Sequence, residues 1–259
     1  MRDSQHGGLG ERDASGVSVL ARTVLARLLG RTVDEGHGPK QELTAALARA
    51  VMASDPNELQ ALRTELRRQR VSESELVDCY FPAVAEHLGC DWAEDRASFA
   101  EVSIGMARLQ AVLHDVSRDW VSNHTAEPTS ATALLVLPEG EQHCFGALLL
   151  MGQLRRRGIS VQLVVGARPE EMRAVMQGRR FDCVMISVGC EDKLEYSRKL
   201  VKAIKAGAGA HVRVAVGGAV LDRAVDVKLL TGADVVTSDP TVALAGLDVR
   251  LHRLDREAG

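Results

Sequence analysis

Residues 131–146 read ATALLVLPEGEQHCFG, and this stretch decides the fold of the chain. Its first seven residues are almost continuously apolar, which is typical of a strand that is covered on both faces of a sheet. The polar run EGEQHCFG that follows predicts a turn leading into a helix. The stretch therefore predicts the first strand and turn of a parallel α/β unit.

Four more runs of this kind follow, at residues 159–165, 183–188, 212–216 and 235–238, with amphipathic stretches between them. Strands that alternate with helices in this way form a parallel sheet with helices on both faces. We expect an α/β domain over residues 131–259 with five parallel strands in the flavodoxin-like, Rossmann-type order 2-1-3-4-5.

The chain before this domain has a different pattern. Over residues 41–125 apolar side chains recur at helical spacing in four segments with short connections, which predicts a four-helix bundle. The second helix is expected to start after Asp55-Pro56, and the third to end at Gly89. Residues 1–40 are expected to form a flexible region with one short helix at 17–29, and a polar linker covers 123–130.

Composition narrows the class of protein. The chain is 46% hydrophobic and 26% charged, with a net charge of −3, so it is expected to be globular and not a basic nucleic-acid binder. Aromatic residues make up only 3%, too few for a base-stacking surface. The five cysteines form no CxxC pair, and no apolar stretch is long enough to span a membrane. We expect a cytoplasmic protein without membrane contact.

Unusual residues follow three of the predicted strands, where an open α/β sheet binds its ligand. The pattern Glu141-x-His143-x-x-Gly146 follows the first strand. The third strand ends in Ser187-Val188-Gly189, and the fourth ends in Gly217-Gly218. Because the carboxyl ends of parallel strands share one edge, these residues are expected to lie together.

This combination resembles the fingerprint of cobalamin-binding domains of the methionine synthase and methylmalonyl mutase type. The resemblance implies that His143 replaces the benzimidazole of the cofactor as the lower cobalt ligand, while the nucleotide tail inserts at the sheet edge. The other cofactor-binding residues that it implies are Glu141, Gly146, Ser187, Gly189, Gly217 and Gly218.

The chemistry of these residue types agrees with that role. Imidazole is a suitable cobalt ligand, and the carboxylate of Glu141 could accept the other ring N–H and fix the tautomer. The hydroxyl of Ser187 can hydrogen-bond a ring nitrogen of the tail, and Gly217-Gly218 lets backbone and ring approach closely. Two positions depart from the pattern: Glu141 replaces the commoner Asp, and Gly189 stands where Leu is usual, which is expected to loosen the tail pocket.

The bundle resembles the helical cap that covers the upper face of cobalamin in light-sensing repressors. Those proteins carry a Trp-His and a Glu-His pair, of which Trp92 and Glu101 are retained here. Ala93 and Val102 stand in place of the two histidines. Trp92 is therefore expected to contact the cofactor, and a small hydroxo or aquo ligand is favoured over a bulky adenosyl group.

Residues 92–102, together with the lack of a recognisable DNA-reading domain, resemble the AerR/PpaA group of purple bacteria. These proteins are cobalamin-binding antirepressors of photosystem genes. The resemblance implies a non-enzymatic regulator that acts through a redox-sensing DNA-binding repressor and has little or no sequence-specific DNA binding alone.

Other interpretations remain open on the sequence. A corrinoid carrier protein of a methyltransferase system would have the same two-domain plan. A haem-binding sensor is a third interpretation, since His143 also suits iron. As an alternative to a role in cofactor binding, Gly217-Gly218 forms only a tight turn between a strand and a helix.

Overall fold

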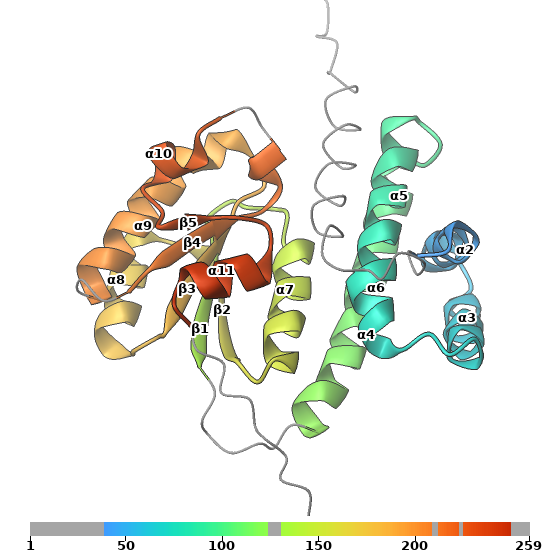
Figure 1. Ribbon diagram of the computed structural model, residues 1–259. Coiled ribbons are helices and arrows are strands. Elements are labelled where there is room, and N and C mark those ends of the chain that lie inside the picture. Colours follow the sequence, from blue (N-terminus) through green and yellow to red (C-terminus); the bar gives the residue numbers. More distant parts are fainter. Residues whose placement is uncertain (1–38, 124–130, 209–211, 223–224, 250–259) are drawn as a thin grey trace, which may run out of the picture.

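The computed structural model describes residues 39–123, 131–208, 212–222 and 225–249, and the helix expected at 17–29 lies outside them. Within this part the chain forms a helical bundle followed by an α/β domain, as the sequence predicts (Figure 1). The exact domain boundaries stay a prediction.

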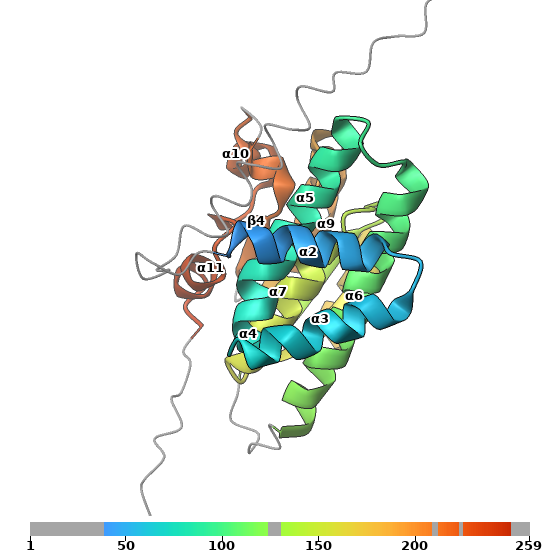
Figure 2. The ribbon, with the colours of Figure 1, turned by 90° about the vertical axis from the view of Figure 1, so that its right-hand side faces the viewer.

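The bundle contains the four predicted helices. They are α2 (Gln41–Met52), α3 (Pro56–Arg68), a continuous third helix made of α4 (Glu73–Glu75), the π-helical turn η1 (Leu76–Tyr80) and α5 (Phe81–Ala93), and finally α6 (Phe99–Asn123). Asp55 caps α3 by accepting a hydrogen bond from the Asn57 N–H, and Pro56 follows at the first helical position. Figure 2 shows α2 and α3 as the outer layer of the bundle.

One predicted boundary is wrong. The third helix does not end at Gly89 but continues to Ala93, because Gly89 keeps the helical backbone. The chain leaves the helix around Asp95, which has a φ of 55°, and the N–H groups of Arg96 and Ala97 donate to the carbonyl of Asp91. Gly89 is therefore a small residue on the helix surface and not a terminator.

The α/β domain has the predicted sheet. Its strands, all parallel, are β1 (Thr132–Pro138), β2 (Ser160–Ala167), β3 (Cys183–Ser187), β4 (Val214–Gly217) and β5 (Val235–Val236). Their order is β2-β1-β3-β4-β5, which confirms the flavodoxin-like topology. In the central register Leu135 of β1 lies opposite Leu163 of β2 and Met185 of β3.

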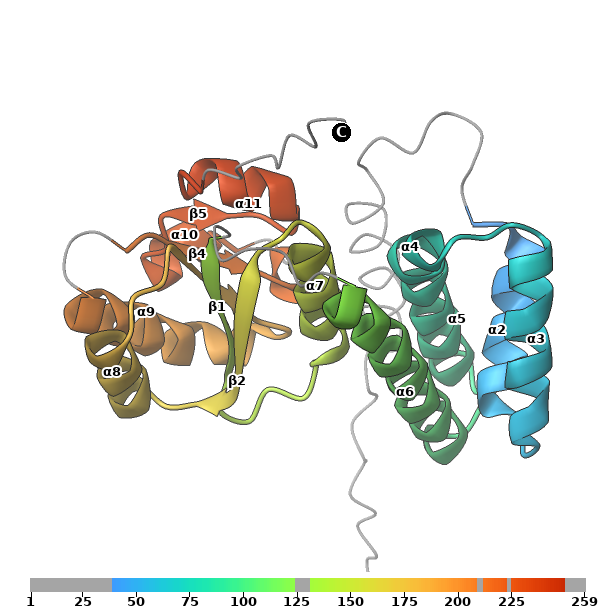
Figure 3. The same cartoon turned by 90° about the horizontal axis from the view of Figure 1, so that it is seen from below.

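Helices cover both faces of the sheet (Figures 1 and 3). One face packs against α7 (Phe145–Arg156) and α11 (Pro240–Gly246). The other packs against α8 (Pro169–Gly178), α9 (Leu194–Ala208) and α10 (Val227–Thr231). Alternate residues of β1 supply the two cores, with Leu135 in the first and Leu134 in the second, as expected for a strand buried on both sides.

Helix α7 joins the two parts of the molecule. Its Ala147 and Leu154 pack against the sheet, whereas Leu149 belongs to the apolar core of the bundle. Figures 1 and 3 both show α6 lying beside α7. The bundle thus packs against α7, the helix that follows β1.

Among the helices in the described ranges, none has the length and apolar character needed to cross a membrane.

Candidate cofactor site

A tight turn after β1 positions the first site residues. The N–H of Glu141 donates to the carbonyl of Pro138 over 3.0 Å, and Gly140 within the turn has a φ of 73°, which favours glycine. Helix α7 starts at Phe145, so residues 141–144 lie between the carboxyl end of β1 and the N-terminus of α7. This is the edge at which open α/β sheets bind ligands.

Glu141 orients the imidazole of His143 by hydrogen bonds. Its side chain is only 2% exposed, and its Oε1 accepts hydrogen bonds from Nδ1 of His143 at 2.8 Å and from the His143 N–H at 2.9 Å. Its Oε2 accepts one from the N–H of Gly189 at 2.7 Å. Because an ionised carboxylate only accepts, Nδ1 carries the ring proton, and the neutral ring has its lone pair on Nε2.

The two groups shift each other's pKa. Burial opposes ionisation of Glu141, but hydrogen bonds from the ring of His143 and from the Gly189 N–H lower its pKa to about 2. The hydrogen bond to Glu141 raises the pKa of His143, against the effect of desolvation. The carboxylate is therefore charged at neutral pH and makes the imidazole a stronger base and ligand.

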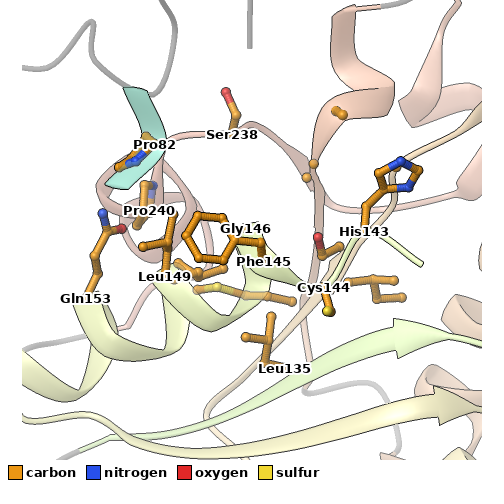
Figure 4. Close-up of a pocket in the computed structure, with 18 of the residues that line it drawn as sticks. Pro82, Leu135, His143, Cys144, Phe145, Gly146, Leu149, Gln153, Ser238 and Pro240 are labelled. Carbon is orange, nitrogen blue, oxygen red and sulfur yellow. The ribbon is translucent and has the colours of Figure 1, made fainter. Parts of the chain in front are cut away.

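A cavity of about 430 Å³ opens beside this pair, with mainly apolar walls. The sheet contributes Leu135, Met185 and Ala215, and the flanking helices contribute Leu149 and Ala243. In Figure 4 the cavity runs from His143 along Phe145, Gly146 and Leu149 of α7 toward Gln153, Pro82 and Pro240.

Most of the predicted site residues meet at this cavity. Its lining includes His143, Gly146, Ser187, Gly189, Gly217 and Gly218, and Glu141 is hydrogen-bonded to His143. The three sequence motifs are therefore brought together, as the parallel topology implies, while their roles toward a cofactor stay predictions.

Trp92 does not line the cavity. It lies at the end of α5, 44% exposed, with its ring centroid 6.1 Å from that of Phe99. Figure 1 shows this end of α5 reaching beyond the N-terminus of α7. Its predicted contact with a cofactor would have to occur outside the cavity.

The glycines at the site differ in what surrounds them. A Cβ on Gly146 would meet nothing within 4 Å, so this residue faces open space. A Cβ on Gly217 would come within 2.6 Å of the Thr237 carbonyl oxygen. Gly218 has a φ of 104°, and its Cβ would come within 2.4 Å of the Val188 carbonyl oxygen. Close backbone packing at the sheet edge thus requires Gly217 and Gly218 irrespective of any ligand.

Sequence reasoning missed the contribution of the bundle to the cavity. Asp78, Pro82 and Ala85 line it from one face of the third helix, and Met106 and Gln110 line it from α6. Their spacing of three or four residues marks one helix face, but this spacing does not show what that face packs against. Packing against α7 is what brings this face to the site.

The donor set bears on which metal group would fit. No group of three or more His, Cys, Asp or Glu able to hold a metal occurs in the part of the chain that the structure describes. A prosthetic group that brings its own metal ligands, as a macrocycle does, would need only His143 from the protein. Two other histidines, His87 of α5 and His114 of α6, lie on the bundle. His87 pairs with Asp91 at 3.5 Å, and neither histidine lines the cavity.

Comparisons with known proteins agree with this chemistry. Residues 131–248 match the family described as B12 binding domain. A Rhodobacter capsulatus protein described as an uncharacterized 20.5 kDa protein in the bchF-crtJ intergenic region is 36% identical over 181 residues, covering 70% of this chain and 94% of that protein. The chain belongs to the same family as this protein, and its second half is a B12-binding domain.

The B12-binding domain and the bundle together resemble a solved structure. The monomethylamine corrinoid protein of Methanosarcina barkeri superposes with a TM-score of 0.62 at 15% identity, covering 82% of this chain and 100% of that chain. This likeness concerns the fold alone.

Proposed function

We propose that the chain is a cobalamin-dependent, light-responsive antirepressor of photosynthesis genes that acts through a redox-sensing DNA-binding repressor. The observation that carries the cofactor part is the imidazole of His143, oriented by Glu141 so that Nε2 can bind, beside an apolar cavity of about 430 Å³.

In this proposal each residue of the site has a definite task. His143 would bind the cobalt through Nε2, and Glu141 would fix its tautomer and orientation. The cavity takes the nucleotide tail: a cavity of about 150 Å³ holds a single benzene ring, so 430 Å³ accommodates a two-ring base. The open space at Gly146 and the hydroxyl of Ser187 face that guest.

The bundle would cover the opposite face of the cofactor. Light breaks the cobalt–carbon bond of alkyl cobalamins in solution, and the hydroxo or aquo product would be small enough to fit under the bundle. Val102 is partly buried against the bundle core, and Ala93 has no polar side chain, so neither supplies a hydrogen bond or a replacement ligand to an upper group. This supports a hydroxo or aquo ligand, with Trp92 proposed to contact the cofactor from this end of the bundle.

The regulatory part rests on the resemblance to the AerR/PpaA group and on the family membership. The relative from Rhodobacter capsulatus belongs, by its description, to the bchF-crtJ intergenic region. The net charge of −3 favours action through a partner over direct DNA binding, because phosphate contacts need a basic surface. We accordingly propose a non-enzymatic role.

The experiment has two arms. Purified protein is mixed with adenosylcobalamin kept dark or illuminated, or with hydroxocobalamin, and the visible spectrum of the gel-filtered protein is recorded, with the His143→Ala variant as control. Gel shifts with a promoter then compare the repressor alone, with apo protein and with loaded protein. The proposal requires a spectrum that depends on His143 and a change in DNA binding by the repressor only with loaded protein.

Other results would favour the alternatives. Methyl transfer to a partner methyltransferase would indicate a corrinoid carrier, and a haem spectrum from the purified protein would indicate a haem sensor. Tight sequence-specific DNA binding by the protein alone at physiological salt would contradict indirect action.

A further inference from the structure

We propose that Gly189 is a positioning residue matched to Glu141: the missing side chain at position 189 makes the space in which the carboxylate holds the imidazole of His143. The inference rests on the proposed function only in taking His143 as the cobalt ligand. The two residues are 48 positions apart in sequence and meet at the sheet edge.

The space around Gly189 is already filled by the pair it supports. A Cβ on Gly189 would lie 2.5 Å from Nδ1 and 2.8 Å from Cγ of His143, and 2.9 Å from Oε1 of Glu141. All three distances are too short for a carbon contact, and all three atoms belong to the hydrogen-bonded pair. Any side chain at position 189 therefore displaces the ring or the carboxylate.

The displacement would act on orientation and not on the fold. His143 is 64% exposed, so its ring can swing outward into solvent when pushed, at the cost of the 2.8 Å bond to Glu141. Gly189 is not among the described glycines with positive φ, so alanine fits its backbone conformation. Alanine also keeps the N–H that donates to Oε2 of Glu141. The Gly189→Ala variant thus removes the space alone.

Glu141 explains why this space is needed. A glutamate side chain is longer than an aspartate by one methylene, about 1.5 Å. That reach lets one carboxylate contact both the Gly189 N–H and the Nδ1 of His143. The two positions at which the sequence departs from the cobalamin-binding pattern are therefore in contact. Because the ring of His143 is the closest neighbour of that Cβ, a shorter acid would make room at position 189 by drawing back both its carboxylate and the imidazole bonded to it, whereas a longer acid would not.

The first test uses apo protein, so it does not depend on cobalamin binding. The ring nitrogen shifts of His143 are measured by NMR at a pH where the ring is neutral, in wild type, Gly189→Ala and Gly178→Ala. Gly178 is a suitable control because a Cβ there meets nothing within 4 Å and its φ is not positive. We expect the Nδ1-protonated form to dominate in wild type and in Gly178→Ala. In Gly189→Ala the ring of His143 should show the tautomer mixture of a solvated imidazole. The Tm of this variant should equal that of the wild type.

The second test uses loaded protein and a double-mutant cycle. Gly189→Ala and Glu141→Asp should each lower hydroxocobalamin affinity about 10-fold to 100-fold, the usual effect of changing a residue that orients a metal ligand. Because the shorter carboxylate of the Glu141→Asp variant leaves room for the alanine, the double variant should lose less than the product of the two single losses.

Opposite results overturn the inference. They are wild-type ring shifts in apo Gly189→Ala, or single losses that multiply in the double variant. If the wild type failed to bind cobalamin, the proposed function would fall, whereas the NMR comparison would still decide the role of Gly189.

Discussion

Asp78 of the bundle and Arg156 of α7 form an ion pair that ties the two parts of the molecule together. The guanidinium of Arg156 donates to both carboxylate oxygens of Asp78, and Gln153 adds a bond of 3.2 Å to Oδ1. The Arg156 side chain is only 15% exposed. The pair therefore stabilises the contact between the bundle and α7, next to the bundle residues that line the cavity.

The Asp78→Asn variant should lower the free energy of unfolding by about 1–3 kcal/mol, because a mostly buried guanidinium loses its charged partner. Urea unfolding followed by circular dichroism measures this change. Arg68→Gln is the control, since Arg68 pairs with Glu65 on the exposed surface of α3 and should have little effect. Equal effects of both substitutions would show that the ion pair does not fasten the bundle.

The open space at Gly146 allows a test of the cavity that leaves the fold intact. A Cβ at this position in α7 meets nothing within 4 Å, so leucine would extend into the cavity. Gly146→Leu should reduce cobalamin affinity at least about 10-fold. The apo protein should keep or gain stability, because leucine favours a helix over glycine by up to about 1 kcal/mol. Unchanged affinity, measured by titration calorimetry, would place the cofactor elsewhere.

The parts of the fold and of the site that could be predicted from the sequence are those that depend on local patterns. The apolar runs predict where the strands lie, because a strand buried on both faces reads as a continuous apolar segment. Their order is expected from the flavodoxin-like pattern of alternating strands and helices. The pairing of Glu141 with His143 is also predictable, because the two residues are only two positions apart and bond within one turn.

Features that depend on tertiary packing were not predictable. The bundle residues Asp78, Pro82 and Gln110 line the cavity only because α5 and α6 pack on α7. Gly89 is read as a helix end from its type alone, although its backbone stays helical. The contact of Gly189 with Glu141 links distant segments, so the sequence indicates the departure at position 189 but not its cause.

The shifted pKa of Asp234 makes the stability of the fold depend on pH. Burial acts to raise the pKa of Asp234, but hydrogen bonds from Lys205 Nζ at 2.9 Å and the Val214 N–H at 2.8 Å lower it below the usual value of 3.8. The ionised form therefore stabilises the fold above about pH 4, and this contribution is lost as the pH falls through the folded-state pKa.

The Asp234→Asn variant should accordingly be less stable than wild type at pH 7, by about 1–2 kcal/mol. The difference should shrink as the pH falls below about 4, where the wild-type carboxyl becomes protonated. Unfolding curves of both proteins across this range measure it. A difference independent of pH would mean that the charge of Asp234 does not contribute.

The end of α5 predicts which form of cobalamin is retained. With Ala93 and Val102 in place of polar residues, the adenosyl form should be lost on gel filtration in the dark, and hydroxocobalamin should stay bound after illumination. Trp92→Ala should weaken that retention with little change in apo stability, because the ring is 44% exposed. Tighter dark retention of the adenosyl form would overturn this account of the bundle.

EPR can measure directly whether His143 binds the cobalt through a ring nitrogen. The protein is produced with ¹⁵N-labelled and with unlabelled histidine, loaded with cobalamin, reduced to the paramagnetic cobalt(II) state and examined by EPR. We predict a nitrogen splitting that changes with the isotope and is absent in His143→Ala. A splitting that is insensitive to the histidine label would show that the cofactor keeps its own base on cobalt, and it would contradict the assignment of His143.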